Sequence, residues 1–395
     1  MSNADPVVIL SYARTPMGSF QGSLAGASAV DLGAAAVRAA VERAGVDPDE
    51  VERCYMGCVL PAGLGQAPAR QAALGAGLPN SVPCTTVNKM CGSGMKTVMM
   101  AYEALHARPT EIMVAGGMES MTNAPYLLPK MRAGARLGHA EVKDHMFLDG
   151  LEDAYDKGRL MGTFAEECAQ SYQFTREAQD ASAIESLKRS KAANENGAFA
   201  KEIVPVAVKT RTGSVEVTQD EQPFTADPGK IPKLKPAFRD GGTVTAANSS
   251  SISDGAAALV LMRESEAKRR NLTPLAKISG VASVAQAPAL FTTAPVGAVR
   301  KLLEAVGWSA KDVGLYEINE AFAVVTMAAM RDLGVPHEKM NVHGGACALG
   351  HPIGASGARI IVTLLAAMEK YGESKGVAAL CIGGGEATAM AIERC

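Results

Sequence analysis

One cysteine of this chain, Cys91, stands in a setting that suits nucleophilic chemistry. Residues 88–94 read NKMCGSG, and an apolar stretch of good helix formers over 95–105 follows them directly. The start of a helix offers unpaired amide N–H groups and the positive end of the helix dipole, and both favour the reactive thiolate. The pattern therefore makes Cys91 a candidate nucleophile. The alternative is a buried cysteine that serves only as a small hydrophobic residue.

A histidine near the other end of the chain could activate such a thiol. His351 lies in a glycine-rich loop over 344–357, just before a further helical segment. Pro352 directs the backbone of His351 toward extended geometry, and the loop could carry the imidazole to a cysteine, as an activated sulfur nucleophile requires. We expect the remaining histidines to lie at the surface or in capping positions; they are His106, His139, His145, His337 and His343.

Two strand ends carry further candidates. An apolar strand over 377–382 contains Cys381 and runs into three glycines that begin with Gly383, whose amide could point into a site. Asn319 closes another expected strand, and a buried amide there could hold a water molecule or a substrate oxygen. A structural thiol remains the alternative for Cys381, and helix capping remains the alternative for Asn319.

Internal repetition indicates that these residues belong to two related halves. The segment 36–45 recurs at 298–307, 91–96 matches 354–359, and 114–119 matches 381–386. Strand patterns alternate with helical patterns, which is the order of an α/β fold. Gly354 stands where the first half has Cys91, so the repeat itself does not require a thiol at that place.

The first half is interrupted over about 120–250 by a segment with no counterpart in the second half. This segment is richer in charge, contains several proline turns and includes a good helix pattern over 175–194. We interpret it as an inserted subdomain that supplies substrate contacts, with a purely oligomerising role as the alternative.

Composition places the chain among soluble globular proteins. Of its 395 residues 47% are hydrophobic and 20% charged, and the formal net charge is -2 without blocks of like charge, so no nucleic-acid partner is expected. The sequence contains no apolar run of about 18 residues, so no membrane-spanning helix is expected. Eight cysteines without a secretion or import signal predict reduced thiols and a cytoplasmic location. The close pair Cys54 and Cys58 lacks further ligands nearby, so no metal site is expected.

Taken together, these motifs resemble the thiolase family, and the resemblance runs essentially from end to end. It rests on NKMCGSG over 88–94, NEAF over 319–322, GHPIGASG over 350–357 and CIGGG over 381–385. The resemblance implies an α/β fold in which two homologous βα halves stack as a five-layer αβαβα core, with an inserted loop domain that binds coenzyme A. The first half would comprise 1–119 and 251–272, the inserted domain 120–250, and the second half 273–395.

Carried over by position, the resemblance assigns Cys91 as the acyl acceptor, His351 as its base and Cys381 as the group that exchanges a proton with the substrate. His351 and a water molecule held by Asn319 would stabilise an enolate oxygen, and the amides of Cys91 and Gly383 would form a second oxyanion hole. The remaining positions carried over are expected substrate contacts: Ser250, Ala246, Phe238, Leu151, Met161, Ala321 and Phe322.

The resemblance, with Met161 similar to the short-chain branch, implies the reversible condensation of two acetyl-CoA molecules to acetoacetyl-CoA and coenzyme A. Both CoA compounds would be substrates, and no separate cofactor is expected. The alternatives are a broader-chain 3-ketoacyl-CoA thiolase of fatty-acid degradation and a non-catalytic acyl-CoA or lipid carrier on the same fold. The family also suggests a homo-oligomer, either a dimer or a tetramer. One departure is the lack of an arginine shortly after Asp220 and Glu221, which leaves the contacts of the CoA nucleotide open.

Overall fold

The computed structural model describes residues 5–395, and a ten-stranded mixed sheet runs through both halves of the chain. In order of hydrogen bonding its strands are β12 (Leu315–Ile318), β13 (Lys375–Ile382), β14 (Glu386–Arg394), β11 (Ala276–Ala285), β1 (Val7–Arg14), β10 (Ser253–Arg263), β5 (Met113–Ser120), β3 (Arg53–Gly57) and β4 (Cys84–Val87), with β2 (Gly18–Ser19) paired to β10. A short antiparallel pairing of β1 with β11 joins the two halves. Each half therefore has its own set of strands.

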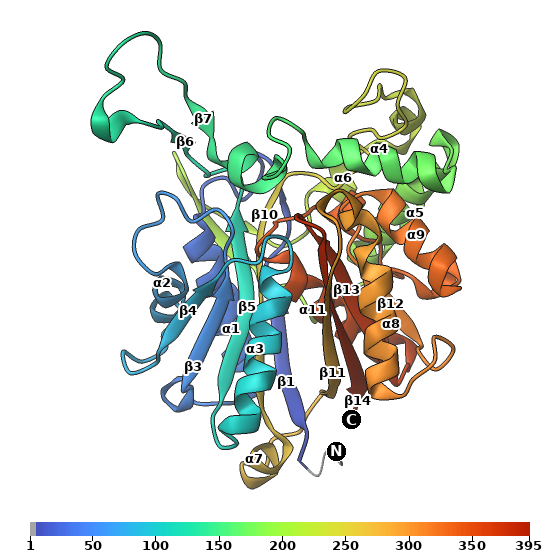
Figure 1. Ribbon diagram of the computed structural model, residues 1–395. Helices are drawn as coiled ribbons and strands as arrows, with labels where there is room; N and C mark the ends of the chain where they lie inside the picture. The colour runs from blue at the N-terminus through green and yellow to red at the C-terminus, as the bar shows by residue number, and fades with distance from the viewer. Residues whose placement is uncertain (1–4) are drawn as a thin grey trace.

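Helices cover both outer faces and fill the space between the two halves (Figure 1). The outer helices are α1 (Ala29–Ala44) and α2 (Pro68–Gly75) on the first half and α8 (Ala294–Val306) and α9 (Ala323–Leu333) on the second. The central helices α3 (Ser93–Ala107) and α11 (Ser356–Tyr371) contact each other, and a separate apolar core surrounds them. The layers therefore run α, β, α, β, α, which confirms the predicted fold.

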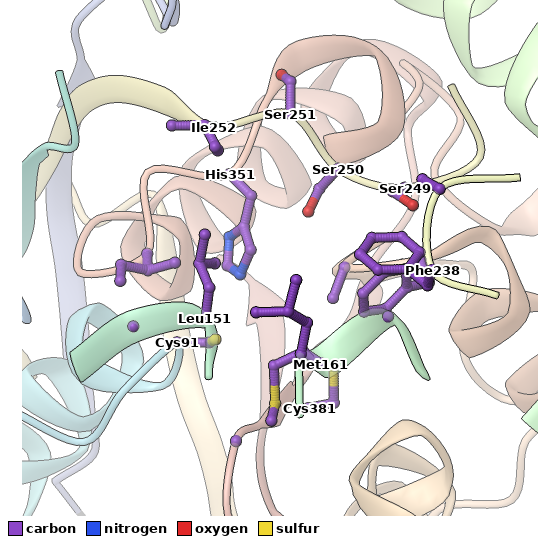
Figure 2. A pocket seen from close by; sticks show the side chains of 18 of the residues that line it. Cys91, Leu151, Met161, Phe238, Ser249, Ser250, Ser251, Ile252, His351 and Cys381 are labelled. Atoms are coloured by element: carbon purple, nitrogen blue, oxygen red, sulfur yellow. The ribbon is translucent and has the colours of Figure 1, made fainter. Parts of the chain in front are cut away.

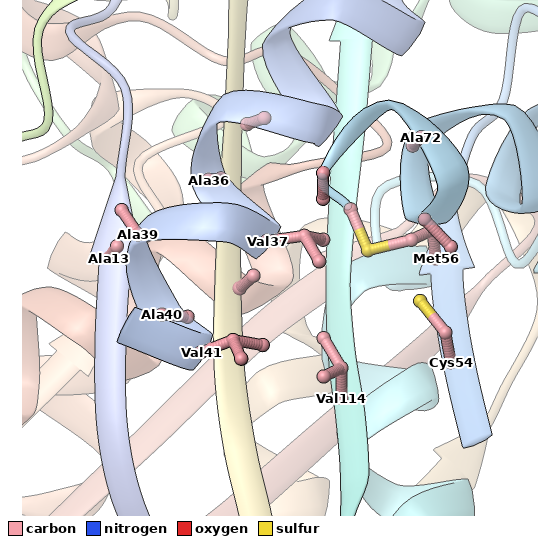
Figure 3. Packing of buried hydrophobic residues seen from close by; sticks show 14 of the residues in the cluster. Ala13, Ala36, Val37, Ala39, Ala40, Val41, Cys54, Met56, Ala72 and Val114 are labelled. Carbon is pink, nitrogen blue, oxygen red and sulfur yellow. The ribbon is translucent and has the colours of Figure 1, made fainter. Parts of the chain in front are cut away.

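The first outer core shows why a composition rich in alanine suits this architecture. Figure 3 shows Ala36 and Ala40 of α1 beside Val37 and Val41, all facing the sheet near Val114 of β5. Small side chains bring the helix axis close to the strands, and the branched side chains fill the remaining space. The same packing recurs under α8, so the two halves are built alike.

Local sequence sets the helix ends as predicted. The Ser28 side chain accepts the amide of Asp31, the Asp31 carboxylate accepts the amide of Ser28, and α1 stops at Gly45 with φ 66°. The repeat helix α8 stops in the same way at Gly307 with φ 69°. The helix expected over 175–194 is α5 (Arg176–Glu195), capped by Thr175.

The third internal match predicts the wrong register, and its spacing is several residues longer than that of the other two. β5 and β13 are both eight-residue strands that occupy the same place in their halves, between β10 and β3 and between β14 and β12. Aligned on these strands, the counterpart of Cys381 is Glu119, one residue before the strand end. Aligning the glycines of the two segments gives this wrong register because Gly116 lies inside β5, whereas Gly383 begins a turn.

The inserted segment takes the place of that tight turn. In the second half the glycines 383–385 connect β13 to β14, with φ of 93° at Gly384 and 87° at Gly385 that favour glycine. In the first half the chain leaves β5 after Ser120 and returns at Ser253, and it covers the same end of both halves (Figure 1). Its elements are β6 (Tyr126–Leu127), β7 (Lys143–Asp144), α4 (Met161–Tyr172), α5, β8 (Val206–Thr210), β9 (Gly213–Val217) and α6 (Gln222–Thr225).

At the seam between the two halves, backbone atoms of Gly94 and Gly117 are in direct contact with the backbone of 354–358. A Cβ atom at Gly117 would lie 2.1 Å from the carbonyl oxygen of Gly354 and 3.0 Å from the Cα atom of Ala355. A Cβ atom at Gly94 would lie 2.7 Å from the amide nitrogen of Ala358. Because backbone atoms cannot swing aside, these positions require glycine. The seam fixes the distance between the two halves.

Replacing Gly117 with alanine should destabilise the protein by about 1–3 kcal/mol, because the added methyl group forces the halves apart. Gly297→Ala in α8 is the control: its Cβ atom would meet only Val284, at 3.7 Å, and alanine stabilises a helix interior by roughly 0.5–1 kcal/mol relative to glycine. Urea denaturation followed by circular dichroism compares the two variants with the unaltered protein. A Gly117→Ala protein of unchanged stability would contradict the tight seam.

Candidate active site

Loops from both halves and from the insertion surround an apolar cavity of about 350 Å³. Figure 2 shows the side chains of Cys91, His351 and Cys381 around it. Every site residue selected from the sequence lines this cavity except Asn319; those that do are Cys91, His351, Cys381, Gly383, Ser250, Ala246, Phe238, Leu151, Met161, Ala321 and Phe322. The first half supplies Cys91, and the second supplies His351, Cys381 and Gly383.

Cys91 lies in the turn that joins β4 to α3, two residues before the first helical residue, Ser93. The preceding residue, Met90, has φ 48°, a left-handed conformation that is costly for a residue other than glycine. Side chains at both ends hold it: the amide of Met90 donates to Oδ1 of Asn88 at 3.0 Å, and the Ser93 hydroxyl donates to the Met90 carbonyl at 2.6 Å. The turn leaves Cys91 half-buried against the cavity.

Burial controls the acidity of Cys91. Desolvation raises the pKa of its thiol to about 11, although the amides of Gly383 and of Cys91 itself favour the thiolate, and nearby Glu119 raises the pKa further. The stabilised thiolate expected from the helix start is therefore wrong for the resting site. The two amides act in the expected direction, but the loss of solvent has the larger effect on the pKa of Cys91.

His351 is held as a neutral base. Burial lowers the pKa of its imidazole to about 3, and the charge of Arg359 adds to this effect. Nδ1 lies 2.6 Å from the hydroxyl of Ser356, and that hydroxyl donates to the carbonyl of Pro352 at 2.9 Å. We infer that the Ser356 oxygen accepts the Nδ1 proton, which leaves Nε2 free to accept a proton from a thiol.

Ser356 was not selected from the sequence, although it lies within the quoted loop motif. The usable signal is its spacing, because a hydroxyl five residues after His351 and at the first position of a helix can turn back toward the imidazole. In the structure this contact is the hydrogen bond between the Ser356 hydroxyl and the ring.

Asn319 lies behind the imidazole rather than on the cavity wall. Its Nδ2 is 3.5 Å from each ring nitrogen of His351, and its Oδ1 is buried with no hydrogen-bond partner among the residues described. It does not cap a helix, because α9 begins at Ala323 after Phe322. The free acceptor suits a water molecule or a substrate group beside the imidazole.

Cys381 lies deeper than Cys91, with 1% of its surface exposed. Burial raises its pKa well above the ordinary value, and the neighbouring Cys91 raises it further. The resting site therefore holds two neutral thiols and a neutral imidazole. Such groups exchange protons only when a substrate brings developing charge into the cavity.

The wall of the cavity that belongs to the insertion is fixed by a buried carboxylate. Glu166 of α4 accepts the amides of Thr243 and Val244 at 2.8 Å each. These bonds hold the segment that continues to Ala246 and Ser250, both of which face the cavity. A rigid wall with few polar groups suits an extended, largely apolar ligand arm.

Two backbone features shape the wall of the cavity that belongs to α4 and to the turn over Phe147–Leu151. A Cβ atom at Gly162 would lie 2.4 Å from the ring of Phe238, so the ring packs flat on α4 beside Met161. A π-helical turn over Phe147–Leu151 directs Phe147 and Leu151 to the cavity. Six apolar lining residues were not selected from the sequence, and only Ile353 lies within one of the four motifs: Phe147, Leu160, Ala237, Ile252, Phe291 and Ile353.

Two histidines expected at the surface or in caps are buried instead. His145 pairs with Asp149 at 2.6 Å, and His343 lies between the rings of Phe199 and Tyr371, where burial lowers its pKa to about 4. The partner of His145 lies only four residues away, whereas the rings beside His343 come from distant segments, so the sequence around His343 gave no sign of its burial. Within residues 5–395 no group of three or more potential metal ligands forms, and no helix is long and apolar enough to cross a membrane.

The raised pKa of Cys91 predicts a steep pH dependence for its alkylation. Because only the thiolate reacts with iodoacetamide, the rate should rise roughly tenfold per pH unit between about pH 7 and 9.5 without levelling off. Peptide mass spectrometry measures the rate at Cys91, with Cys91→Ser as the control for the assigned peptide. A plateau below about pH 8 would contradict acidity controlled by burial.

Comparison with known proteins gives this geometry a family context. Residues 7–265 match the family described as "Thiolase, N-terminal domain", and residues 272–394 match "Thiolase, C-terminal domain". Acetyl-CoA acetyltransferase 1 of Arabidopsis thaliana is 52% identical over 391 residues, which cover 98% of this chain and 94% of the relative. The acetyl-CoA acetyltransferase of Escherichia coli strain K12 is 52% identical over 389 residues, 98% of each chain.

Solved structures show the same likeness. The acetyl-CoA acetyltransferase of Bacillus anthracis has a TM-score of 0.96 at 41% identity and covers 99% of both chains. The Acat5 thiolase of Ascaris suum, solved in complex with coenzyme A, has a TM-score of 0.93 at 42% identity and covers 99% of this chain and 100% of its own. Both family domains match in order along nearly the whole sequence, and the chain belongs to the thiolase family.

Proposed function

We propose that this protein is an acetyl-CoA C-acetyltransferase that condenses two acetyl-CoA molecules to acetoacetyl-CoA and coenzyme A, and that also runs the reverse thiolysis. The observation that carries the proposal is the convergence of Cys91, His351, Cys381 and the amide of Gly383 on one apolar cavity. The relatives named acetyl-CoA acetyltransferases, about half identical along the whole chain, support it.

In the first half-reaction the sulfur of Cys91 attacks the thioester carbon of acetyl-CoA. Nε2 of His351 takes the thiol proton as charge develops, which is necessary because the raised pKa of Cys91 leaves little free thiolate. The amides of Cys91 and Gly383 donate hydrogen bonds to the carbonyl oxygen as it becomes negative. The departing coenzyme A sulfur takes a proton from Cys381, and the acetyl group remains on Cys91.

In the second half-reaction the Cys381 thiolate removes a proton from the methyl group of another acetyl-CoA. Its raised pKa makes this thiolate a strong base once it forms. His351, now protonated, and a water molecule held by Asn319 stabilise the enolate oxygen. The enolate carbon attacks acetyl-Cys91, acetoacetyl-CoA forms, and the Cys91 thiolate recovers its proton from His351.

The cavity is small, which favours a short acyl group. Its volume of about 350 Å³ lies near the lower end for small-molecule sites, and it must also hold the end of the pantetheine arm. Phe147, Leu151 and Met161 line it. Coenzyme A and acetyl-CoA act as substrates here, and the proposed chemistry requires no other cofactor.

We also propose a cytoplasmic homo-oligomer, either a dimer or a tetramer. Exposed apolar side chains gather on the projecting hairpin of β6 and β7 (Figure 1), and Leu137 is 94% exposed; the others are Tyr126, Leu128, Met131 and Val142. Apolar surface of this kind on a projecting segment is typical of a contact between subunits. The free cysteines of the described chain suit a reducing compartment.

Incubation with acetyl-CoA should add one acetyl group to the peptide that contains Cys91, as measured by mass spectrometry after acid quenching. Cys91→Ala should show no adduct. Cys381→Ala should form the adduct more slowly, because the departing coenzyme A loses its proton donor, and should release no acetoacetyl-CoA, because enolate formation needs that base. An unmodified Cys91 peptide in the unaltered protein would favour a carrier without catalysis.

Thiolysis of acetoacetyl-CoA should be at least tenfold faster than thiolysis of a 3-ketoacyl-CoA with a long chain, since a cavity of about 350 Å³ leaves little room for a long tail. Leu151→Ala should reduce this difference in rate by enlarging the cavity, while Leu290→Ala, on an exposed residue outside the cavity lining, serves as the control. Initial rates of thiolysis at saturating coenzyme A give this comparison between the two substrates. A faster reaction on the long chain would replace the proposal by a broader-chain thiolase.

A further inference from the structure

Glu119 is a fully buried carboxylate that the proposed reaction does not use. Its oxygens accept the amides of Val59 at 2.9 Å, Leu60 at 3.1 Å and Gly354 at 2.9 Å, and the Cys58 thiol lies 3.6 Å away. Desolvation raises its pKa to about 7 against the opposite effect of these donors. Burying a carboxylate is costly, so a set of three backbone donors indicates a specific role.

The three amides come from different halves of the molecule. Val59 and Leu60 follow β3 in the first half, whereas Gly354 belongs to the second half and comes three residues after His351. A Cβ atom at Gly354 would lie 2.6 Å from the Glu119 carboxylate, so this close approach also depends on glycine. Glu119 therefore ties the histidine loop to the half of the molecule that carries Cys91.

The internal repeat gives this contact a counterpart. Glu119 occupies in β5 the place that Cys381 occupies in β13. Gly354 comes two residues before α11, just as Cys91 comes two residues before α3. At this strand position the second half thus places the Cys381 thiol near Cys91. The first half places the Glu119 carboxylate against the Gly354 amide.

We propose that Glu119 is a positioning residue: by accepting the Gly354 amide it fixes the loop over 351–354 and so aims His351 at Cys91. The other side of this loop is held by the bond from the His351 amide to the Ser251 carbonyl at 3.1 Å. With both anchors in place the imidazole keeps its direction during acetylation. The inference rests on the proposed function, since it names Cys91 acetylation as the step affected.

The test is Glu119→Gln, which keeps the size of the side chain. One carboxylate oxygen accepts both Val59 and Gly354 and the other accepts Leu60, so either orientation of the glutamine sets an N–H group against a backbone N–H group. The rate constant of Cys91 acetylation at saturating acetyl-CoA should fall at least tenfold, while the half-saturating concentration stays within twofold, because the pantetheine wall is untouched. Rapid quenching and mass spectrometry of the Cys91 peptide give both quantities.

Asp254→Asn is the matched control. Asp254 is also fully buried and lies on the neighbouring strand β10, but its bonds go to Ser120 at 3.2 Å and Thr122 at 3.0 Å, not to the second half. We expect its acetylation rate to stay within twofold of that of the unaltered protein, and the melting temperatures of both variants show whether each is folded. An equal loss of rate in both variants would overturn the positioning role, as would an unchanged rate in Glu119→Gln.

Glu119→Asp keeps the charge but withdraws the carboxylate by one methylene, so it cannot span all three amides. It should fold and show a several-fold lower acetylation rate with the same half-saturating concentration; an unchanged rate would count against the proposal. Amide exchange of the unaltered protein adds a measurement without mutation, since a Gly354 amide that exchanges freely would also overturn it. If the unaltered protein forms no acetyl-Cys91, the proposed function fails instead.

Discussion

The seam between the two halves is the constraint on which the rest of the structure depends. Gly117 meets the backbone beside Gly354, and Gly94 meets the start of α11, without side chains between them. The groups proposed to react come from both sides of this seam: Cys91 from the first half and His351, Cys381 and Gly383 from the second. A site assembled in this way keeps its geometry only if the halves cannot slide, and contact between backbones gives that rigidity.

Burial then sets the chemistry of the site. Withdrawal of solvent raises the pKa of both thiols and lowers that of the imidazole, so all three groups rest in their neutral forms. Because these side chains are neutral, a thioester can bind beside them without the cost of removing water from a charged group. Withdrawal of solvent also makes the hydrogen bonds to a developing oxyanion count for more than they would in water.

Sequence reasoning recovered the elements that local rules control and the motifs that chemistry controls. The ends of α1 and α5 followed from Ser28, Gly45 and Thr175, and the four motifs selected residues that the fold brings to one cavity, with Asn319 just behind it. What depended on three-dimensional packing was not predictable. Desolvation raises the pKa of Cys91 and so disfavours the expected thiolate. The burial of His343 depends on rings from distant segments.

The insertion between β5 and β10 has a consequence for how the chain is made. β10 lies between β1 and β5 in the sheet, yet it follows both of them in the sequence, after the whole insertion. As the chain leaves the ribosome, β1 and β5 must therefore keep open edges until residues 253–263 emerge to pair with them. Pairings between such distant segments form slowly, and open edges invite pairing with other chains. We expect the nascent first half to be the stage of synthesis at which this protein most needs a chaperone.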